Sequence, residues 1–119
     1  MSAIFKTMKE IIHGVCPSKS NCYKIGPRGM YKGSALKQYE KDFFIQCRNR
    51  GKKLEGYFEI YVDVFYPNQR ADLDNALKVI LDCLQRCEVI VNDNKCVKIV
   101  ANKFLDKDKP RIEIEIKTV

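Results

Sequence analysis

The sequence lacks the features that mark membrane-spanning and exported proteins. No apolar run approaches the roughly 18–20 residues that a membrane-crossing helix needs. The opening stretch, MSAIFKTMKEIIHG, has neither the apolar core nor the small-residue cleavage site of a signal peptide. We therefore expect a cytoplasmic protein that makes no membrane contact.

Histidine is scarce, and the cysteines lack the spacing of typical zinc ligands. His13 is the single histidine, and no two cysteines form a CxxC pair. A chain of 119 residues can bury a core without disulfides. Zinc binding and disulfide pairing stay as alternatives, but we expect reduced core thiols, with two of them as buried neighbours on a helix. The six are Cys16, Cys22, Cys47, Cys83, Cys87 and Cys96.

Acidic residues are absent between Glu10 and Glu40, although the whole chain carries 15 acids against 22 Lys+Arg and a net charge of +7. Cations interleaved with tyrosines suit a phosphate backbone, so this stretch is predicted to contact nucleic acid. An ordinary solvated basic surface is the alternative. The cations are Lys19, Lys24, Arg28, Lys32 and Lys37, and the aromatic residues are Tyr23, Tyr31 and Tyr39.

The hydropathy pattern predicts the order strand, helix, strand, helix, strand, strand. Ser34 is the expected helix N-cap and Gly51 the expected stop of the first helix. The predicted segments are a strand at 10–16, a loop with turns at 17–33, a helix at 35–50, a strand at 56–67, a helix from 73, and strands at 96–105 and 111–119.

These elements favour an α+β fold, a two-layer sandwich with helices packed mainly on one face of a mixed sheet. We expect the last two strands to form a hairpin. We expect one domain over residues 1–119, with 1–7 as a flexible extension. The strand at 56–67 carries aromatic residues on both faces. Its second face is a candidate dimer surface, although we expect a helix to cover it.

Two carboxylates stand two residues apart at a strand-to-helix junction, in the stretch RADLDNALK. If the backbone is extended there, Asp72 and Asp74 face the same way and can share one hard cation. Mg²⁺ commonly takes one or two carboxylates together with substrate phosphates. Asp93 is a third acid that a turn after the second helix could return to this pair.

Helix capping and ion pairing offer a simpler interpretation of the same residues. Asp72 or Asp74 can cap the helix, and Asp74, Lys78 and Asp82 are spaced four apart as an ion-pair stripe. Arg70 and Lys78 also bracket the acids, as a metal-dependent phosphodiesterase requires.

The segment from Arg70 to Asp93 resembles the signature of the RusA family of Holliday junction resolvases. That signature is a basic residue, D-x-D-N, a lysine four residues later, D-x-L, and a hydrophobic run leading to a further Asp. The matching residues are Arg70, Asp72, Asp74, Asn75, Lys78, Asp82, Leu84 and Asp93, and CPSKSNCYK is similar to a family segment through Pro17, Ser18, Asn21 and Tyr23.

The resemblance implies a magnesium-dependent homodimer that nicks opposing strands of a four-way DNA junction, in a bacterial, prophage or phage context. Mn²⁺ is an expected substitute for Mg²⁺. It implies Asp72, Asp74 and Asp93 as metal-binding catalytic acids and Lys78 as the active-site lysine. Expected DNA contacts are Lys19, Lys24, Arg28, Lys32 and Arg70.

The chain departs from the family pattern at two places. Arg70 stands alone where the family often has several arginines, and Asn92 stands where it often has an acid. These departures keep two alternatives open: a catalytically silent module that binds branched DNA, and a metal nuclease acting on other branched DNA.

Overall fold

The computed structural model describes residues 7–17 and 23–119. The elements follow the predicted order, with one additional hairpin and one short 3-10 helix. They are β1 (Thr7–His13), β2 (Tyr23–Gly26), β3 (Gly29–Lys32), α1 (Ser34–Gln46), β4 (Phe58–Tyr66), α2 (Leu73–Arg86), η2 (Asp93–Lys95), β5 (Cys96–Leu105) and β6 (Arg111–Thr118).

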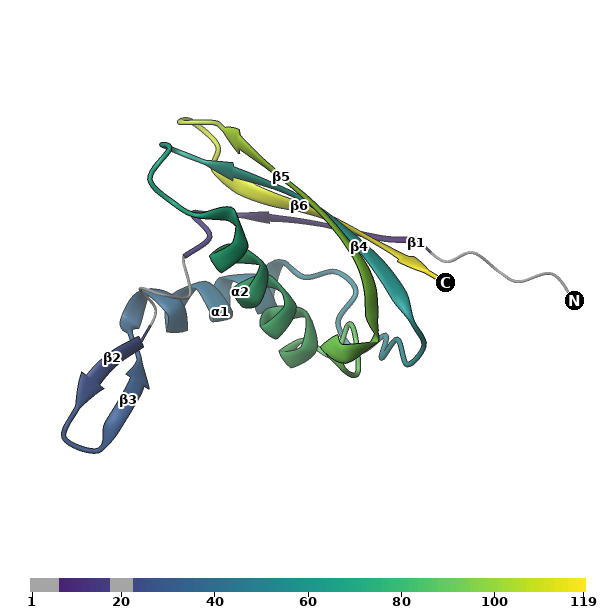
Figure 1. Ribbon diagram of the computed structural model, residues 1–119, viewed down its shortest axis with the longest axis horizontal. Coiled ribbons are helices and arrows are strands. Elements are labelled where there is room, and N and C mark those ends of the chain that lie inside the picture. The colour runs from purple at the N-terminus through teal and green to yellow at the C-terminus, as the bar shows by residue number, and fades with distance from the viewer. Residues whose placement is uncertain (1–6, 18–22) are drawn as a thin grey trace, which may run out of the picture.

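The main sheet has the strand order β1-β6-β4-β5 and is mixed, as predicted (Figure 1). β4 pairs parallel to β5, and β6 pairs antiparallel to both β4 and β1. The prediction of a hairpin between the last two strands is wrong, because β4 lies between them. The crossover through α2 brings the chain back to the end of the sheet where β4 began, so β5 runs parallel to β4 along one side of it. β6 then turns back and pairs antiparallel with β4 along the other side.

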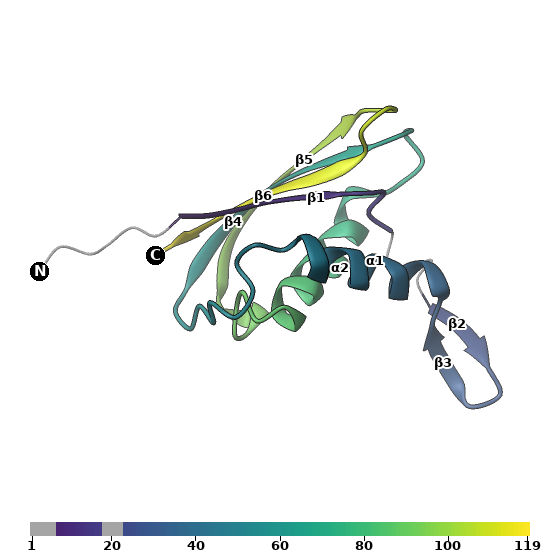
Figure 2. The same cartoon turned by 180° about the vertical axis from the view of Figure 1, so that it is seen from behind.

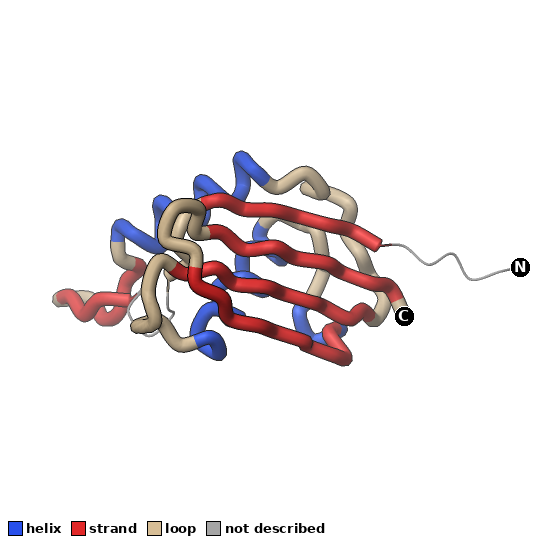
Figure 3. The backbone as a smooth tube through the Cα atoms, turned by 90° about the horizontal axis from the view of Figure 1, so that it is seen from above, coloured by secondary structure: helices blue, strands red, loops and turns tan. Residues whose placement is uncertain are grey.

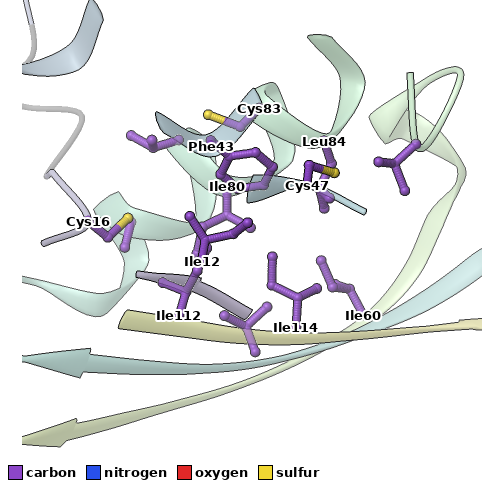
Figure 4. Packing of buried hydrophobic residues seen from close by; sticks show 14 of the residues in the cluster. Ile12, Cys16, Phe43, Cys47, Ile60, Ile80, Cys83, Leu84, Ile112 and Ile114 are labelled. Carbon is purple, nitrogen blue, oxygen red and sulfur yellow. The ribbon is translucent and has the colours of Figure 1, made fainter. Parts of the chain in front are cut away.

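One face of the sheet carries the core. Side chains of β4 alternate along its length, with Phe58, Ile60, Val62, Val64 and Tyr66 buried. Buried side chains of both helices pack on these residues from the same side (Figure 4). The prediction of an α+β fold with helices packed on one face is therefore confirmed.

No described helix covers the opposite face of the sheet, so the expected cover over the second face of β4 is wrong. Side chains of β1 and β6 on this face form ion pairs: Lys9 Nζ lies 3.6 Å from Glu115 Oε2, and Arg111 Nε lies 2.8 Å from Glu113 Oε2. Polar pairing of this kind suits a solvated sheet face.

Part of the predicted loop at 17–33 folds as an antiparallel hairpin. Pro27 and Arg28 form the turn between β2 and β3, and Gly29 adopts a φ of +102° that favours glycine. The hairpin projects away from the sheet and the helices (Figure 2).

Several boundaries differ from the prediction. β1 begins three residues earlier, at Thr7, so Thr7 is not part of an extension; residues 1–6 lie outside the described chain. Gly33 is the N-cap of α1 in place of Ser34. α1 ends at Gln46, before the predicted stop at Gly51.

The cysteines behave largely as predicted core thiols. Five are described, and the buried ones are Cys16, Cys47, Cys83 and Cys87. Burial raises the pKa of the Cys83 thiol well above its ordinary value. Cys22 lies outside the described residues.

In the described part of the chain, no helix is long and apolar enough to cross a membrane.

Candidate active site

The two predicted carboxylates stand where the chain enters α2. Asp72 is the N-cap residue, with an extended backbone at φ −91° and ψ 130°, and Asp74 lies in the first helical turn. Both side chains are exposed. The backbone is extended at Asp72, but α2 begins at Leu73, so the predicted condition of an extended backbone between the two acids is met only at Asp72.

The capping interpretation explains the position of Asp72 but not its carboxylate. Its side chain makes no cap hydrogen bond, whereas Asp74 Oδ1 accepts only from the N–H of the next residue, Asn75, at 3.0 Å. Within the described residues, Asp74 and Lys78 form no ion pair, so that part of the predicted stripe is absent. The carboxylate oxygens of Asp72 remain available to a ligand.

Lys103 of β5 holds the loop that delivers Asp72. Its Nζ donates to the carbonyl oxygens of Gln69 and Ala71, at 3.0 and 2.6 Å. The sequence prediction did not include Lys103, although the sequence carries a signal for this role. Apolar residues occupy alternate positions along β5, and Lys103 interrupts that series with a cation. In the structure it pairs with the buried Val64.

Tyr66 lies beneath this loop at the end of β4. Burial, followed by the charges of Cys16 and Asp72, raises its pKa well above the ordinary value for tyrosine. Its buried hydroxyl has no hydrogen-bond partner in the described chain. The hydroxyl therefore sits close enough to the Asp72 carboxylate to be influenced by its charge.

The two predicted cations flank the acid pair. Lys78 lies one helical turn after Asp74 and is exposed. Arg70 is also exposed, and its backbone N–H donates to Asn68 Oδ1 at 3.0 Å, which fixes the turn before Asp72. The helix N-terminus adds partial positive charge at the same place, so an anionic phosphate would be stabilised there.

Asp93 does not join this pair within one protomer. It begins η2, and its backbone N–H donates at 3.1 Å to Gln85 Oε1, in the last turn of α2. Asp72 lies at the other end of that helix, which is about 21 Å long at 1.5 Å per residue. The pairing of β4 with β5 agrees. The two strands are parallel, so the start of β5, which Asp93 precedes, lies at the opposite end of the sheet from the end of β4, which Asp72 follows.

The donor set fits Mg²⁺ only in part. Two exposed carboxylates near a helix N-terminus suit a cation that keeps several waters and takes phosphate oxygens. However, no group of three His, Cys, Asp or Glu side chains placed to hold a metal occurs in the part of the chain that the structure describes. One protomer thus offers Asp72 and Asp74, and the predicted third ligand is at a distance.

The predicted DNA contacts divide between two places. Arg70 stands beside the acids, whereas Lys24 and Lys32 lie on β2 and β3, with the exposed Arg28 at the turn between them. Lys19 lies outside the described residues. Two apolar side chains also lie exposed on this hairpin, Ile25 at 86% and Met30 at 72%, and they occupy paired positions.

Comparison with known protein families places the chain in a class of DNA-cleaving enzymes. Residues 16–117 match the family model described as "Endodeoxyribonuclease RusA", which spans most of the chain. The chain belongs to this family, as the sequence signature predicted. A curated relative, the crossover junction endodeoxyribonuclease RusA of Aquifex aeolicus (strain VF5), is 33% identical over 104 residues, covering 83% of this chain and 82% of the relative.

Proposed function

We propose that this protein is a magnesium-dependent endodeoxyribonuclease that resolves four-way DNA junctions by paired symmetric nicks, in DNA recombination and repair. The observation that carries the proposal is the exposed pair Asp72 and Asp74 at the start of α2, in a chain of the RusA family. The name of the Aquifex relative, a crossover junction endodeoxyribonuclease, supports the choice of substrate.

Asp72 and Asp74 would hold Mg²⁺, with Mn²⁺ as a substitute. When bound, the ion supplies positive charge to the scissile phosphate and lowers the pKa of water. Lys78 would donate to a phosphate oxygen on which negative charge develops. In the hydrolysis, a water oxygen bonds to phosphorus, the bond from phosphorus to the leaving oxygen breaks, and that oxygen receives a proton.

Asp93 would complete the site from a second protomer. Since α2 separates Asp93 from Asp72 by its whole length, the three acids can meet only if another copy supplies one of them. A two-fold dimer then contains two equivalent sites, each built from Asp72 and Asp74 of one protomer and Asp93 of its partner. Two such sites suit paired nicks on a junction with two-fold symmetry.

The projecting hairpin would bind the DNA backbone away from the cutting site. It carries Lys24, Arg28 and Lys32 in a stretch without acids, so it presents positive charge alone. Such contacts bring affinity that does not depend on base sequence and that falls with added salt. Arg70 would contact a phosphate close to the acids.

A junction-cleavage assay with and without Mg²⁺ tests the proposal. Wild-type protein should nick opposing strands of a synthetic four-way junction, and Asp72→Asn and Asp74→Asn should bind it normally without cutting. Asp108→Asn, which neutralises an exposed acid elsewhere, should cut like wild type. Equal cutting by Asp74→Asn and wild type would remove that residue from the site.

Two other results of this assay would favour an alternative function over junction resolution. Tight junction binding without cutting in Mg²⁺ or Mn²⁺ would identify a silent DNA-binding module, which the lone arginine and Asn92 favour. Preferential cutting of flaps over junctions would identify a nuclease for other branched DNA.

A further inference from the structure

β5 is a free edge of the main sheet. It pairs with β4 on one side, and no other described strand pairs with it (Figure 3). Its ten residues leave a row of backbone N–H and C=O groups open along the other side. Long open edges of this kind readily pair with another strand.

This edge strand carries exposed apolar side chains as well as two exposed lysines, Lys98 and Lys103. Val97, Ile99 and Leu105 are 55%, 45% and 53% exposed. Natural edge strands are usually protected by charges, prolines or short length, and β5 has two lysines but no proline and is ten residues long. We propose that β5 pairs antiparallel with β5 of a second copy of this chain, so that the two four-stranded sheets form one continuous sheet.

A row of half-buried leucines on α2 extends the same surface. Leu73, Leu77 and Leu81 recur every four residues and so lie along one side of the helix. Cys83 and Arg86 point roughly the opposite way, into the groove that α2 forms with α1. Because α1 contacts β1 while α2 contacts β5, the leucine row faces the β5 edge.

Antiparallel pairing would also complete the active site, and this step rests on the proposed function. Asp93 begins η2, which leads directly into β5, and Lys103, near the end of β5, holds the loop before Asp72. An antiparallel partner places the start of one β5 beside the end of the other. Asp93 would thereby approach the partner's Asp72, with η2 and the loop on the same face of the joined sheet.

Two other surfaces fit a second copy less well. The uncovered sheet face carries ion pairs, including Lys117 Nζ with Glu115 Oε1 at 3.5 Å, which a partner would have to desolvate. β1 is the other edge, but it lies three strands away from β5. A dimer through β1 would leave Asp93 far from the partner's acids.

Two isoleucines in the two edge strands give a matched test. Ile99 of β5 is 45% exposed and Ile11 of β1 is 52% exposed. In sedimentation velocity without DNA, wild type and Ile11→Glu should be dimers, and Ile99→Glu should be a monomer with an unchanged far-ultraviolet circular dichroism spectrum. A monomeric wild type, or a dimeric Ile99→Glu, would overturn the interface.

Disulfide trapping tests the interface even if Ile99→Glu fails to fold. In a two-fold antiparallel pair, the residue nearest the axis faces its own copy. One of Val100→Cys, Ala101→Cys and Asn102→Cys should therefore form a covalent dimer under mild oxidation, well above the wild-type background and above Ile11→Cys. Background levels at all three positions would contradict β5 pairing.

Cleavage separates the interface from the proposed function. A wild-type protein that dimerises through β5 but cuts no junction would leave the interface standing and refute the function. A monomeric wild type that cuts junctions would refute the interface and leave the function standing.

Discussion

Glu10 is the one acidic side chain buried among the described residues, at 2% exposure. Its carboxylate accepts from the backbone N–H groups of Arg48 and Asn49 and from the Asn49 side-chain amide. These donors take the place of water and tie β1 to the chain that leaves α1. The carboxylate also contacts Cys47 Sγ and lies near Cys87, the C-cap of α2, so it is at the opposite end of that helix from the acid pair.

We predict that Glu10→Ala lowers the free energy of unfolding by about 2–3 kcal/mol, because it leaves buried donors without an acceptor. Urea unfolding followed by circular dichroism measures this. Glu55→Ala removes an exposed carboxylate and should change the free energy by less than about 0.5 kcal/mol. Equal effects of the two substitutions would show that the Glu10 contacts contribute nothing.

Asp106 gives a prediction for acid pH. The N–H of Lys109 and the guanidinium of Arg111 stabilise its carboxylate and lower its pKa below the ordinary 3.8. A lowered pKa stabilises the folded protein above the ordinary value, and this contribution disappears as the pH falls through the folded-state pKa. Asp106→Asn should therefore melt below wild type near neutral pH and match it in strong acid. A gap that persists in strong acid would contradict this assignment.

Lys103 is expected to act through the loop and not on the substrate directly. Lys103→Met removes both hydrogen bonds to the loop before Asp72, so the carboxylate should be less well placed. We predict a cleavage rate roughly tenfold lower, with more Mg²⁺ needed for half-maximal rate and unchanged junction binding. Lys103→Arg should recover part of the rate.

Lys107→Met removes a nearby exposed cation and is the matched control. It should cleave like wild type at every Mg²⁺ concentration. If both methionine variants show the same Mg²⁺ dependence as wild type, Lys103 does not position Asp72.

Residue types predicted the acid pair but not Lys103 and Tyr66, the residues that lie next to its loop. The spacing of Asp72 and Asp74 on either side of a helix start follows from the chain alone. Lys103 is distant in sequence, and its contact with Ala71 depends on β5 pairing parallel to β4. Tyr66 looked like an ordinary strand residue, because its nearness to Asp72 depends on how the following loop turns back.

At the scale of elements, the β2–β3 hairpin is the feature that the hydropathy pattern did not predict. Two prolines and three glycines between residues 17 and 33 indicated a loop. The turn chemistry at Pro27 and Gly29 equally permits two short strands, and four-residue strands give too little periodicity to recognise. Longer elements with clear periods, such as β4 and α2, were predicted correctly.

We predict that the triple substitution Lys24→Ala, Arg28→Ala and Lys32→Ala weakens junction binding without lowering the melting temperature. If all three cations contact phosphates, the slope of log affinity against log salt should fall by about 3. Fluorescence anisotropy with a labelled junction at several salt concentrations measures this. An unchanged slope would show that the DNA backbone does not contact the β2–β3 hairpin. Lys52→Ala, Lys53→Ala and Lys107→Ala together form a charge-matched control.

At the scale of the whole molecule, the separation of Asp72 from Asp93 is the decisive geometric fact. A sequence shows that three acids are present and how far apart they are along the chain. It does not show that a helix of 14 residues places two of them at opposite ends of one protomer. Assembly is therefore part of the proposed chemistry, and activity should follow the fraction of protein that is dimeric.

Cleavage by a mixed dimer tests the shared site most directly. Asp72→Asn and Asp93→Asn chains with different affinity tags are co-expressed, and the heterodimer is purified through both tags. If sites are shared between protomers, one of its two sites contains only wild-type residues, so it should nick one strand of the junction while both homodimeric variants stay inactive. An inactive heterodimer that still binds the junction would contradict the shared site, as would full activity of the Asp93→Asn homodimer.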